Sequence, residues 1–401
     1  MYTRLLNIGQ IPENRSFFVF GPRATGKTTL VNNYIKSLGN FLIYDLLKSD
    51  DFLRLNASPA TFRKEVEARL PDAGILHVHL DEVQKIPKLL DEVQYLIEKY
   101  TGRVRFILSG SSARKLKRAG ANLLAGRAWE YHLYPFTTIE LGSDFDLADA
   151  LQFGTIPSVA TLSSAQEKIE TLGSYVSTYL REEIQAEALT RKLDAFHRFL
   201  EAAALCNGEL VNMSDIAREA SVQRKTVTEY YKILEDTLVG FFLPSWGHRL
   251  SRKQLVEHGK FYFFDTGIVS ALNKRLSAAM ERSNPLFGRI FEHFCILEFM
   301  HIHGYKHTEH KVGFFRTRAG AEVDLIEERH GKIRAIEIKS HTNIGPNQIR
   351  GLINFSREFP DAELLLVCLI PQEISLGKVR CVPYHKFFQD EWKDQPRSET
   401  I

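Results

Sequence analysis

One eight-residue stretch constrains the fold of this chain more than any other. GPRATGKT at 21–28 follows directly on the apolar run SFFVF at 16–20 and leads into a helical pattern. The G-x-x-x-x-G-K-[ST] spacing between a strand and a helix is typical of a P-loop, because Gly21 and Gly26 let the backbone curl with its N–H groups pointing inward at phosphates. We expect these residues to contact a nucleotide: Gly21, Pro22, Arg23, Ala24, Thr25, Gly26, Lys27, Thr28 and Thr29.

A P-loop of this kind works with a carboxylate pair on a neighbouring strand. Lys27 is expected to reach the β- and γ-phosphates, and the Thr28 hydroxyl to ligate Mg²⁺. The apolar stretch ILHVHLDE at 75–82 ends in the required pair. Asp81 is the predicted Walker-B metal ligand, and Glu82 is the predicted general base that orients water toward the γ-phosphate.

Two further residues are candidates for the same site. VRFILSGSS at 104–112 ends its apolar part at Ser109, which is expected to act as a polar sensor that helps to fix the water; it could also simply begin a turn or cap a helix. Arg127 follows a glycine on a loop, from which it could stabilise γ-phosphate charge in cis or from a neighbouring subunit. A solvated surface arginine is the alternative for Arg127.

Short apolar runs alternate with helix-length amphipathic segments over the first 140 residues, which predicts an α/β domain with a parallel sheet. The expected strands are 16–20, 41–44, 75–80 and 104–108, and the expected helices are 27–38, 61–70 and 88–100. His77 and His79 stand on a strand that should be buried on both faces. We expect both to be core or strand-edge histidines rather than metal ligands.

The region from about 165 to 240 is rich in Ala, Leu, Glu and Arg and shows no clear strand, which predicts a helical domain. Ser214 could cap DIAREA at 215–220, and 223–238 offers a second helix at helix-turn-helix spacing. FFLP at 241–244 and FYFF at 261–264 are the expected wing strands of a winged helix. Basic residues near these elements suit phosphate contacts: Arg224, Lys225, His248, Arg249, Arg252 and Lys253. A protein-contact or lid module is the alternative.

Several segments together resemble the bacterial and archaeal ATPases of the AAA+/STAND group, in which a P-loop domain is fused to a C-terminal domain of unknown function. They are GPRATGKTTL, HLDEVQKIP, ILSGSS, LAGRAWEYHLYPFTTIEL, YVSTYLREEI, GELVNMSDIA and KFYFFDTGIVSAL. The resemblance spans nearly the whole chain. It implies an AAA+ ATPase that uses ATP and Mg²⁺, and it implies assembly into rings or smaller homo-oligomers.

The C-terminal region carries a second set of charged residues on apolar strands. Asp324 lies in AEVDLIEE, and Glu337 and Lys339 lie two apart in AIEIKS, so they project from one face. This is similar to the PD-(D/E)xK nuclease-like fold, in which carboxylates hold a divalent metal and the lysine positions or activates water. Glu292, in the helical GRIFEHFCILEF, is a further candidate metal ligand. A solvated cross-strand pattern on an edge sheet is the alternative.

Composition sets the remaining limits. A chain of 401 residues is expected to form two or three domains, and we place them at 1–145 (P-loop ATPase), 146–275 (helical and winged-helix) and 276–401 (nuclease-like α/β). No stretch approaches 18 apolar residues and the first residues do not resemble a signal peptide, so we expect a cytoplasmic protein with no membrane partner. Its four scattered cysteines are expected to be reduced.

The net charge of +3 excludes a globally basic nucleic-acid binder but permits a local patch, since acidic clusters and basic stretches cancel. The leading hypothesis is therefore an ATP-hydrolysing enzyme that acts on DNA through its winged-helix and nuclease-like regions, with a second divalent metal in the latter. The alternative is a nucleotide-gated switch that binds DNA or protein and cuts neither. A nucleotide-binding chaperone is a third, weaker hypothesis.

Overall fold

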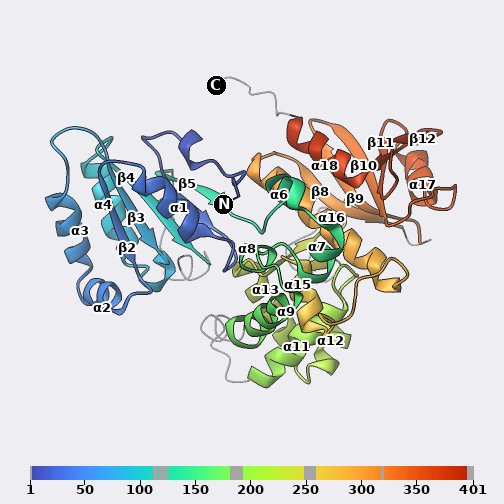
Figure 1. Ribbon diagram of the computed structural model, residues 1–401, viewed down its shortest axis with the longest axis horizontal. Helices are drawn as coiled ribbons and strands as arrows, with labels where there is room; N and C mark the ends of the chain where they lie inside the picture. The colour runs from blue at the N-terminus through green and yellow to red at the C-terminus, as the bar shows by residue number, and fades with distance from the viewer. Residues whose placement is uncertain are drawn as a thin grey trace. The chain divides into compact units, whose positions relative to one another are not determined.

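A computed structural model describes residues 2–111, 116, 124, 126–180, 193–247, 259–317 and 320–394 (Figure 1). The chain divides into two compact units. Unit 1 comprises Met1–Pro135 with Asp236–Leu238, and unit 2 comprises Phe136–Glu235 with Val239–Ile401. The division into three domains stays a prediction.

Unit 1 is built on a five-stranded parallel sheet with the order β2-β3-β4-β1-β5. Its strands are β1 (Ser16–Phe20), β2 (Phe41–Asp45), β3 (Leu76–Asp81), β4 (Val104–Gly110) and β5 (Ala128–His132), and its α-helices are α1 (Lys27–Lys36), α2 (Ser49–Ala57), α3 (Pro59–Ala68) and α4 (Leu89–Lys99); short 3-10 turns occupy η1 (Ile8–Gln10) and η2 (Val83–Lys85). The four expected strands and three expected helices are confirmed to within about two residues at most ends. The sequence reading missed α2 and β5.

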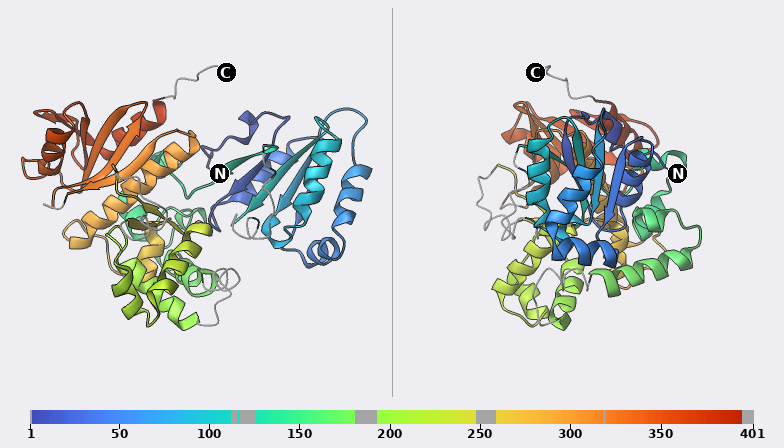
Figure 2. Two further views of the ribbon diagram at one scale, coloured as in Figure 1. Left: turned by 180° about the vertical axis from the view of Figure 1, so that it is seen from behind. Right: turned by 90° about the vertical axis from the view of Figure 1, so that its left-hand side faces the viewer.

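Helices cover both faces of this sheet (Figure 2). Phe62 of α3 packs on Phe106 of β4, so α3 lies with α4 on one face, whereas α1 lies against β3 and β4 on the other. The side chains of β3 alternate accordingly. Leu76, Val78 and Leu80 join the apolar core that includes residues of α3 and α4. The odd-numbered positions of β3, which carry His77, His79 and Asp81, are therefore left for the α1 face.

The first part of unit 2 is helical, as expected. Its elements are α6 (Thr138–Leu141), η3 (Gly142–Asp144), α7 (Leu147–Phe153), α8 (Pro157–Ala160), α9 (Ala165–Ser174), the π-helical η4 (Tyr175–Leu180), α11 (Leu193–Leu205), α12 (Met213–Glu219), α13 (Arg224–Asp236), the hairpin β6 (Gly240–Leu243) and β7 (Lys260–Phe263), and α15 (Thr266–Leu272). The predicted cap of α12 is wrong. Asn212 caps it, accepting from the N–H groups of Ser214 and Asp215.

The two predicted helices and the two predicted strands of the winged helix occur in the expected order. Arg224 and Lys225 begin α13. The basic residues His248, Arg249, Arg252 and Lys253 lie outside the described residues. The assignment of these elements as a winged helix therefore rests on their order alone and stays a prediction.

The rest of unit 2 is a six-stranded mixed sheet with the order β12-β13-β11-β10-β9-β8. It comprises α16 (Pro285–Tyr305), β8 (Lys311–Arg316), β9 (Glu322–Arg329), β10 (Lys332–Lys339), α17 (Arg350–Glu358), β11 (Glu363–Cys368), β12 (Ile374–Leu376), β13 (Val379–Pro383) and α18 (Tyr384–Lys393). Strands β8, β9 and β10 are antiparallel, and β10 pairs with β11 in parallel.

Each face of this second sheet has its own apolar core. Ile336 and Ile338 of β10 pack in one cluster with Phe291 of α16, and Ala335 packs in the other with Leu352 of α17. The alternation within AIEIKS therefore determines which residues of β10 are apolar core and which remain for charged groups.

Close packing of α17 on β9 yields a stability prediction. A Cβ atom on Gly351 would lie 2.3 Å from the backbone oxygen of Glu322 and 3.4 Å from Oε2 of Glu337. Because a backbone oxygen cannot rotate away, we expect Gly351→Ala to lower the free energy of unfolding by about 1–3 kcal/mol. Urea unfolding measures this change.

Gly173 in α9 is the matched control, since a Cβ atom there has nothing within 4 Å among the described residues. Gly173→Ala should stabilise the helix by about 0.5–1 kcal/mol, because alanine loses less backbone entropy than glycine. Equal effects of the two substitutions would show that α17 does not pack tightly on β9.

Candidate functional site

The loop at 21–28 lies between β1 and the first turn of α1. A Cβ atom at Gly21 would be 2.2 Å from the backbone oxygen of Leu133, and Gly26 has a φ of +89°, so both positions need glycine. Lys27 is buried, and its Nζ donates hydrogen bonds of 2.8 Å to the backbone oxygens of Gly21 and Pro22. The loop thus wraps around a buried ammonium group at a helix N-terminus, an arrangement that suits phosphate binding.

The hydroxyl of Thr28 faces the carboxylate of Asp81. Thr28 Oγ1 donates a 2.7 Å hydrogen bond to Asp81 Oδ2, and Ser109 Oγ donates to Asp81 Oδ1. The sheet order brings Thr28, Asp81 and Ser109 together, because β3 and β4 are neighbouring parallel strands and both end at the edge of the sheet where α1 begins. A hydroxyl and a carboxylate oxygen are ligands that Mg²⁺ accepts, so the pair fits the predicted metal.

His79 supports Asp81 from inside the sheet. Hydrogen bonds join its Nε2 to Ser109 Oγ at 2.8 Å and its Nδ1 to Asn32 Oδ1 of α1 at 3.0 Å. Burial lowers the pKa of His79 to about 4, so the ring is neutral near pH 7. His79 thus lies in the core with both ring nitrogens hydrogen-bonded. Its contact with Ser109 could not be predicted from the sequence.

Glu82 and Arg127 are held by other partners. Glu82 is buried with a φ of 58°, and its carboxylate accepts a hydrogen bond from Gln84, which also donates to Ser111 Oγ at 3.0 Å. Arg127 forms a 2.7 Å ion pair with Glu98 of α4, with both side chains well exposed. The predicted roles of Glu82 as base, Ser109 as sensor and Arg127 as γ-phosphate ligand stay predictions.

A second site lies within unit 2, where the structure brings together the residues predicted from the D…E-x-K pattern. We call Glu292 of α16, Asp324 of β9 and Glu337 of β10 the carboxylate centre. Lys339 Nζ lies 2.6 Å from Glu337 Oε1 and 3.7 Å from Asp324 Oδ2. Asp324 Oδ2 also accepts a 2.8 Å hydrogen bond from the backbone N–H of Ile338.

Strand β7 adds two groups that sequence reasoning missed. Lys260 Nζ lies 3.4 Å from Glu292 Oε1 and 2.7 Å from Glu322 Oε1, and Tyr262 donates a 2.9 Å hydrogen bond to Glu292 Oε1. Lys260 is only 4% exposed. Their spacing of two residues on a strand of aromatic residues was the only available signal, since it places both on one face.

The carboxylate centre is electrostatically crowded. Burial, followed by the charge of Asp324, raises the pKa of Glu292 to about 7 and that of Glu337 to about 8. Burial opposes the charge of Lys260, but the facing carboxylates hold its pKa above the usual value. Within the described part of the chain, Glu337 Oε2 has no hydrogen-bond partner. Among the described residues, these three carboxylates do not bring one oxygen each within 4.8 Å of one another, so the carboxylate centre is not closed around a metal-sized space.

Acidic and basic side chains both line a cavity beside Glu292. This cavity of about 440 Å³ is lined by Glu292, Lys260 and Glu322 and also by Arg289 of α16 and Arg316 of β8. Two arginines beside a carboxylate centre could contact phosphate groups of a ligand that enters the cavity.

Comparison with known proteins adds family information in three parts. Residues 13–142 match a family described as "AAA domain", residues 144–279 match a domain of unknown function (DUF8612), and residues 287–387 match another (DUF4143). Uncharacterised proteins of Mycobacterium bovis and Mycobacterium tuberculosis are each 28% identical over 323 residues, which cover 80% of this chain and 69% of theirs.

A solved structure, AMPPCP-bound DnaA from Aquifex aeolicus, is 15% identical and covers 58% of this chain and 84% of its own, but its TM-score of 0.26 is too low to support an argument. Together with the P-loop and the parallel sheet, the AAA-domain match supports an AAA-type ATPase with a C-terminal domain of unknown function. Among the described residues, none of the helices has the length and apolar character needed to span a bilayer.

The ion pairs of Lys260 yield a pH-dependent prediction. Lys260→Met removes the cation but keeps the length of the side chain. The pKa of Glu292 should then rise further above 7, so at about pH 8.5 folding must either bind a proton at this carboxyl or bury a less compensated charge, whereas at about pH 6 the carboxyl is largely protonated with or without Lys260. We expect the free energy of unfolding to fall by about 3 kcal/mol at the higher pH and by clearly less at the lower pH. Urea unfolding at both pH values measures the difference.

Lys311→Met is the control, because this lysine forms an exposed ion pair with Glu328. Its effect should stay within about 0.5 kcal/mol at either pH. A loss for Lys260→Met that does not change with pH would contradict the electrostatic assignment.

Proposed function

We propose that unit 1 binds ATP with Mg²⁺ and hydrolyses it. The observation that carries this proposal is the 2.7 Å hydrogen bond between Thr28 Oγ1 and Asp81 Oδ2 beside the buried Lys27. A bound Mg²⁺ would supply charge neutralisation for the phosphates, with Thr28 and Asp81 as its protein ligands. Lys27 would exchange its two backbone acceptors for phosphate oxygens.

The hydrolytic step needs a base and charge stabilisation. Glu82 directly follows Asp81, and we propose that it accepts a proton from the attacking water. Ser109, held by Asp81, would orient polar groups around that water. Arg127 would have to leave Glu98 to reach a γ-phosphate, either in its own subunit or in a neighbouring one; this is the role we propose for a homo-oligomer.

Substitutions of Lys27 and Glu82 separate binding from turnover. Lys27→Ala should weaken ATP binding by at least about 30-fold, because a buried charged partner of the phosphates is lost. Glu82→Gln should retain binding but lower turnover by about 100-fold or more. Fluorescent-nucleotide titration and phosphate release measure the two quantities.

Lys36→Ala, at an exposed lysine of the same helix, is the control and should leave both quantities unchanged. Turnover by Glu82→Gln at the rate of the unmodified chain would exclude Glu82 as the base.

We further propose that unit 2 acts on DNA. The order of elements from α16 through β8, β9, β10 and α17 to β11, with Asp324 on β9 and Glu337 and Lys339 on β10, supports the proposal of a PD-(D/E)xK nuclease-like domain. To hold the second divalent metal, Glu292, Asp324 and Glu337 would have to move closer together. Arg289 and Arg316 would contact the phosphates of the strand.

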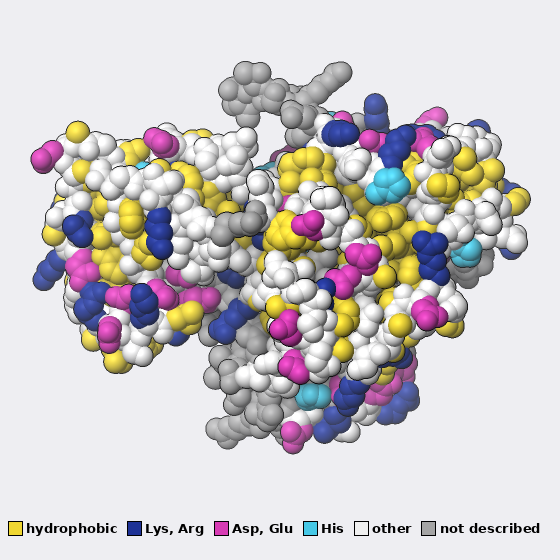
Figure 3. Space-filling model, viewed as in Figure 1, with side chains coloured by type: hydrophobic (Ala, Val, Ile, Leu, Met, Phe, Trp, Pro, Cys, Tyr) yellow, Lys and Arg dark blue, Asp and Glu magenta, His cyan; other side chains and the backbone are white. Residues whose placement is uncertain are grey.

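Lys260 favours the alternative, a nucleotide-gated switch that binds DNA or protein without cutting it. Its ammonium group is paired with Glu292, one of the three carboxylates that a metal would need. A fixed cation in this position neutralises the centre without supplying an activated water. On the face shown in Figure 3, basic and acidic side chains are interspersed, so this face offers no broad basic surface for DNA.

A cleavage assay with Mg²⁺ or Mn²⁺ distinguishes these two functions. For a nuclease, Asp324→Asn and Lys339→Ala should each lower plasmid nicking by about 100-fold or more. The control Lys332→Ala, at an exposed lysine of the strand that carries Lys339, should leave nicking unchanged. Nicking should rise between about pH 6 and pH 8, because Glu292 and Glu337 must lose their protons before they bind a metal.

For the switch, the unmodified chain should not nick DNA with either metal. ATP-dependent binding of the partner should be lost in Lys27→Ala and retained in Asp324→Asn. Equal nicking by the unmodified chain and both site variants would exclude the carboxylate centre as the nuclease.

A further inference from the structure

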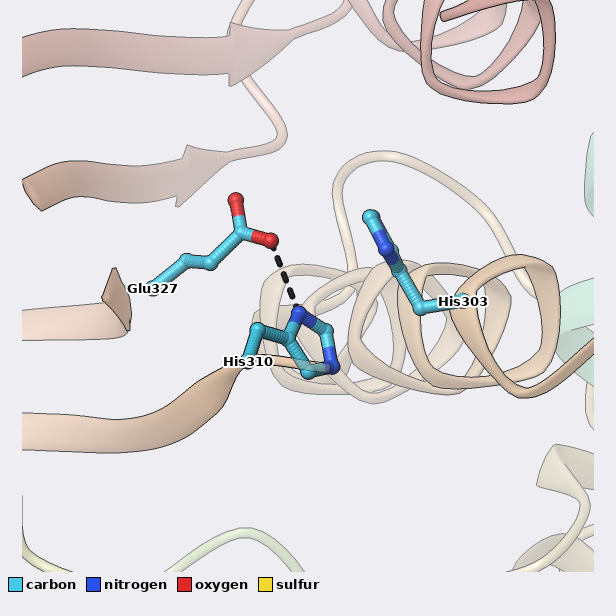
Figure 4. A group of neighbouring side chains, drawn as sticks. All are labelled: His303, His310 and Glu327. Atoms are coloured by element: carbon cyan, nitrogen blue, oxygen red, sulfur yellow. Dashed lines mark hydrogen bonds and ion pairs between the residues drawn. The ribbon is translucent and has the colours of Figure 1, made fainter. Parts of the chain in front are cut away.

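Two histidines and a glutamate meet in unit 2 away from the carboxylate centre (Figure 4). His303 lies in the last turns of α16, His310 lies just before β8, and Glu327 is on β9. One ring nitrogen of each histidine and one carboxylate oxygen of Glu327 all lie within 4.8 Å of one another. His310 Nδ1 is 2.7 Å from Glu327 Oε1, and the two imidazole rings are 4.7 Å apart.

These side chains are sheltered from water. His303 is 2% exposed and Glu327 is 1% exposed. Nδ1 of His303 has no hydrogen-bond partner among the residues that the structure describes. A buried ring nitrogen without such a partner is available to bind a ligand.

The remaining contacts orient the cluster. His303 Nε2 lies 2.9 Å from Glu391 Oε2 of α18, so one ring nitrogen is held by a carboxylate while the other is left unused. Metal-binding histidines are usually held in this way. Arg334 contacts the other oxygen of Glu327 at 2.8 Å and also pairs with Glu391, which leaves Glu327 Oε1 on the histidine side.

Carboxylates outnumber the cation beside the cluster. Arg334 pairs with Glu327 and Glu391 and lies 3.6 Å from a third carboxylate, that of Glu363. Carboxylates in excess of the fixed cations favour a bound cation over a bound anion.

We propose that His303, His310 and Glu327 form a structural site for a transition-metal ion of the Zn²⁺ class. Two imidazole nitrogens and one carboxylate oxygen are ligands that Zn²⁺ and Co²⁺ prefer and that Mg²⁺ and Ca²⁺ do not. The ion would join the end of α16 to β9. The segment HIHGYKHTEH at 301–310 contains four histidines, and two of them belong to this site.

Cobalt binding to the purified, nucleotide-free full chain tests the proposal. We expect about one Co²⁺ per chain with the intense visible absorption of a four-coordinate ion that has nitrogen ligands, displaced by Zn²⁺. His303→Gln and His310→Gln should each weaken this binding by at least about 10-fold. His307→Gln, at an exposed histidine of the same stretch, should leave it unchanged.

The variant Asp324→Asn distinguishes Co²⁺ bound at the histidine site from Co²⁺ bound at the carboxylate centre. Its visible Co²⁺ absorption should equal that of the unmodified chain, because the proposed site does not use Asp324. This arm remains decisive if the histidine variants fail to fold. Absence of the visible bands from the unmodified chain, their loss in Asp324→Asn, or their survival in both folded histidine variants would overturn the proposal.

Discussion

The hydrogen bond between Thr28 and Asp81 joins the first turn of α1 to the end of β3, and the geometry of unit 1 depends on it. It can form only because β3 places its apolar residues toward α3 and α4 and its polar residues toward α1. His79 and Asn32 then fill the space between sheet and helix with hydrogen bonds rather than with apolar contacts. The polar face of one buried strand thereby holds Asp81 and His79 against α1.

In unit 2 the main constraint is the clustering of acidic side chains. Its carboxylate centre consists of the buried Asp324 and Glu337 and the half-buried Glu292. Two lysines that are far apart in the sequence form ion pairs with these groups. Lys339 belongs to the same strand as Glu337, but Lys260 comes from the β6–β7 hairpin of the helical part. A ligand that displaced Lys260 from Glu292 would therefore also disturb that hairpin. This contact offers a physical route by which the helical part and the carboxylate centre could influence each other.

The sequence predicts local features well and long-range contacts poorly. The P-loop, the carboxylate pair at 81–82 and the D…E-x-K strands are predicted from spacing within one or two elements. In the structure Thr28 contacts Asp81, and Lys339 contacts Glu337. Lys260 and the bond between His79 and Ser109 could not be predicted, because tertiary packing decides which distant strands meet. Arg127 shows the same limit, since nothing in its own loop indicates that Glu98 of α4 is its partner.

Local ion pairing also explains how a chain with a net charge of only +3 contains dense clusters of charged side chains. Lys260 and Lys339 each contact two carboxylates within unit 2 and Arg334 contacts three, so much of its charge is compensated inside these clusters. Compensated charges contribute little field at a distance, because the fields of opposite charges a few ångströms apart largely cancel and salt screens the remainder beyond a Debye length of about 8 Å. The net charge of +3 therefore says little about what these clusters bind.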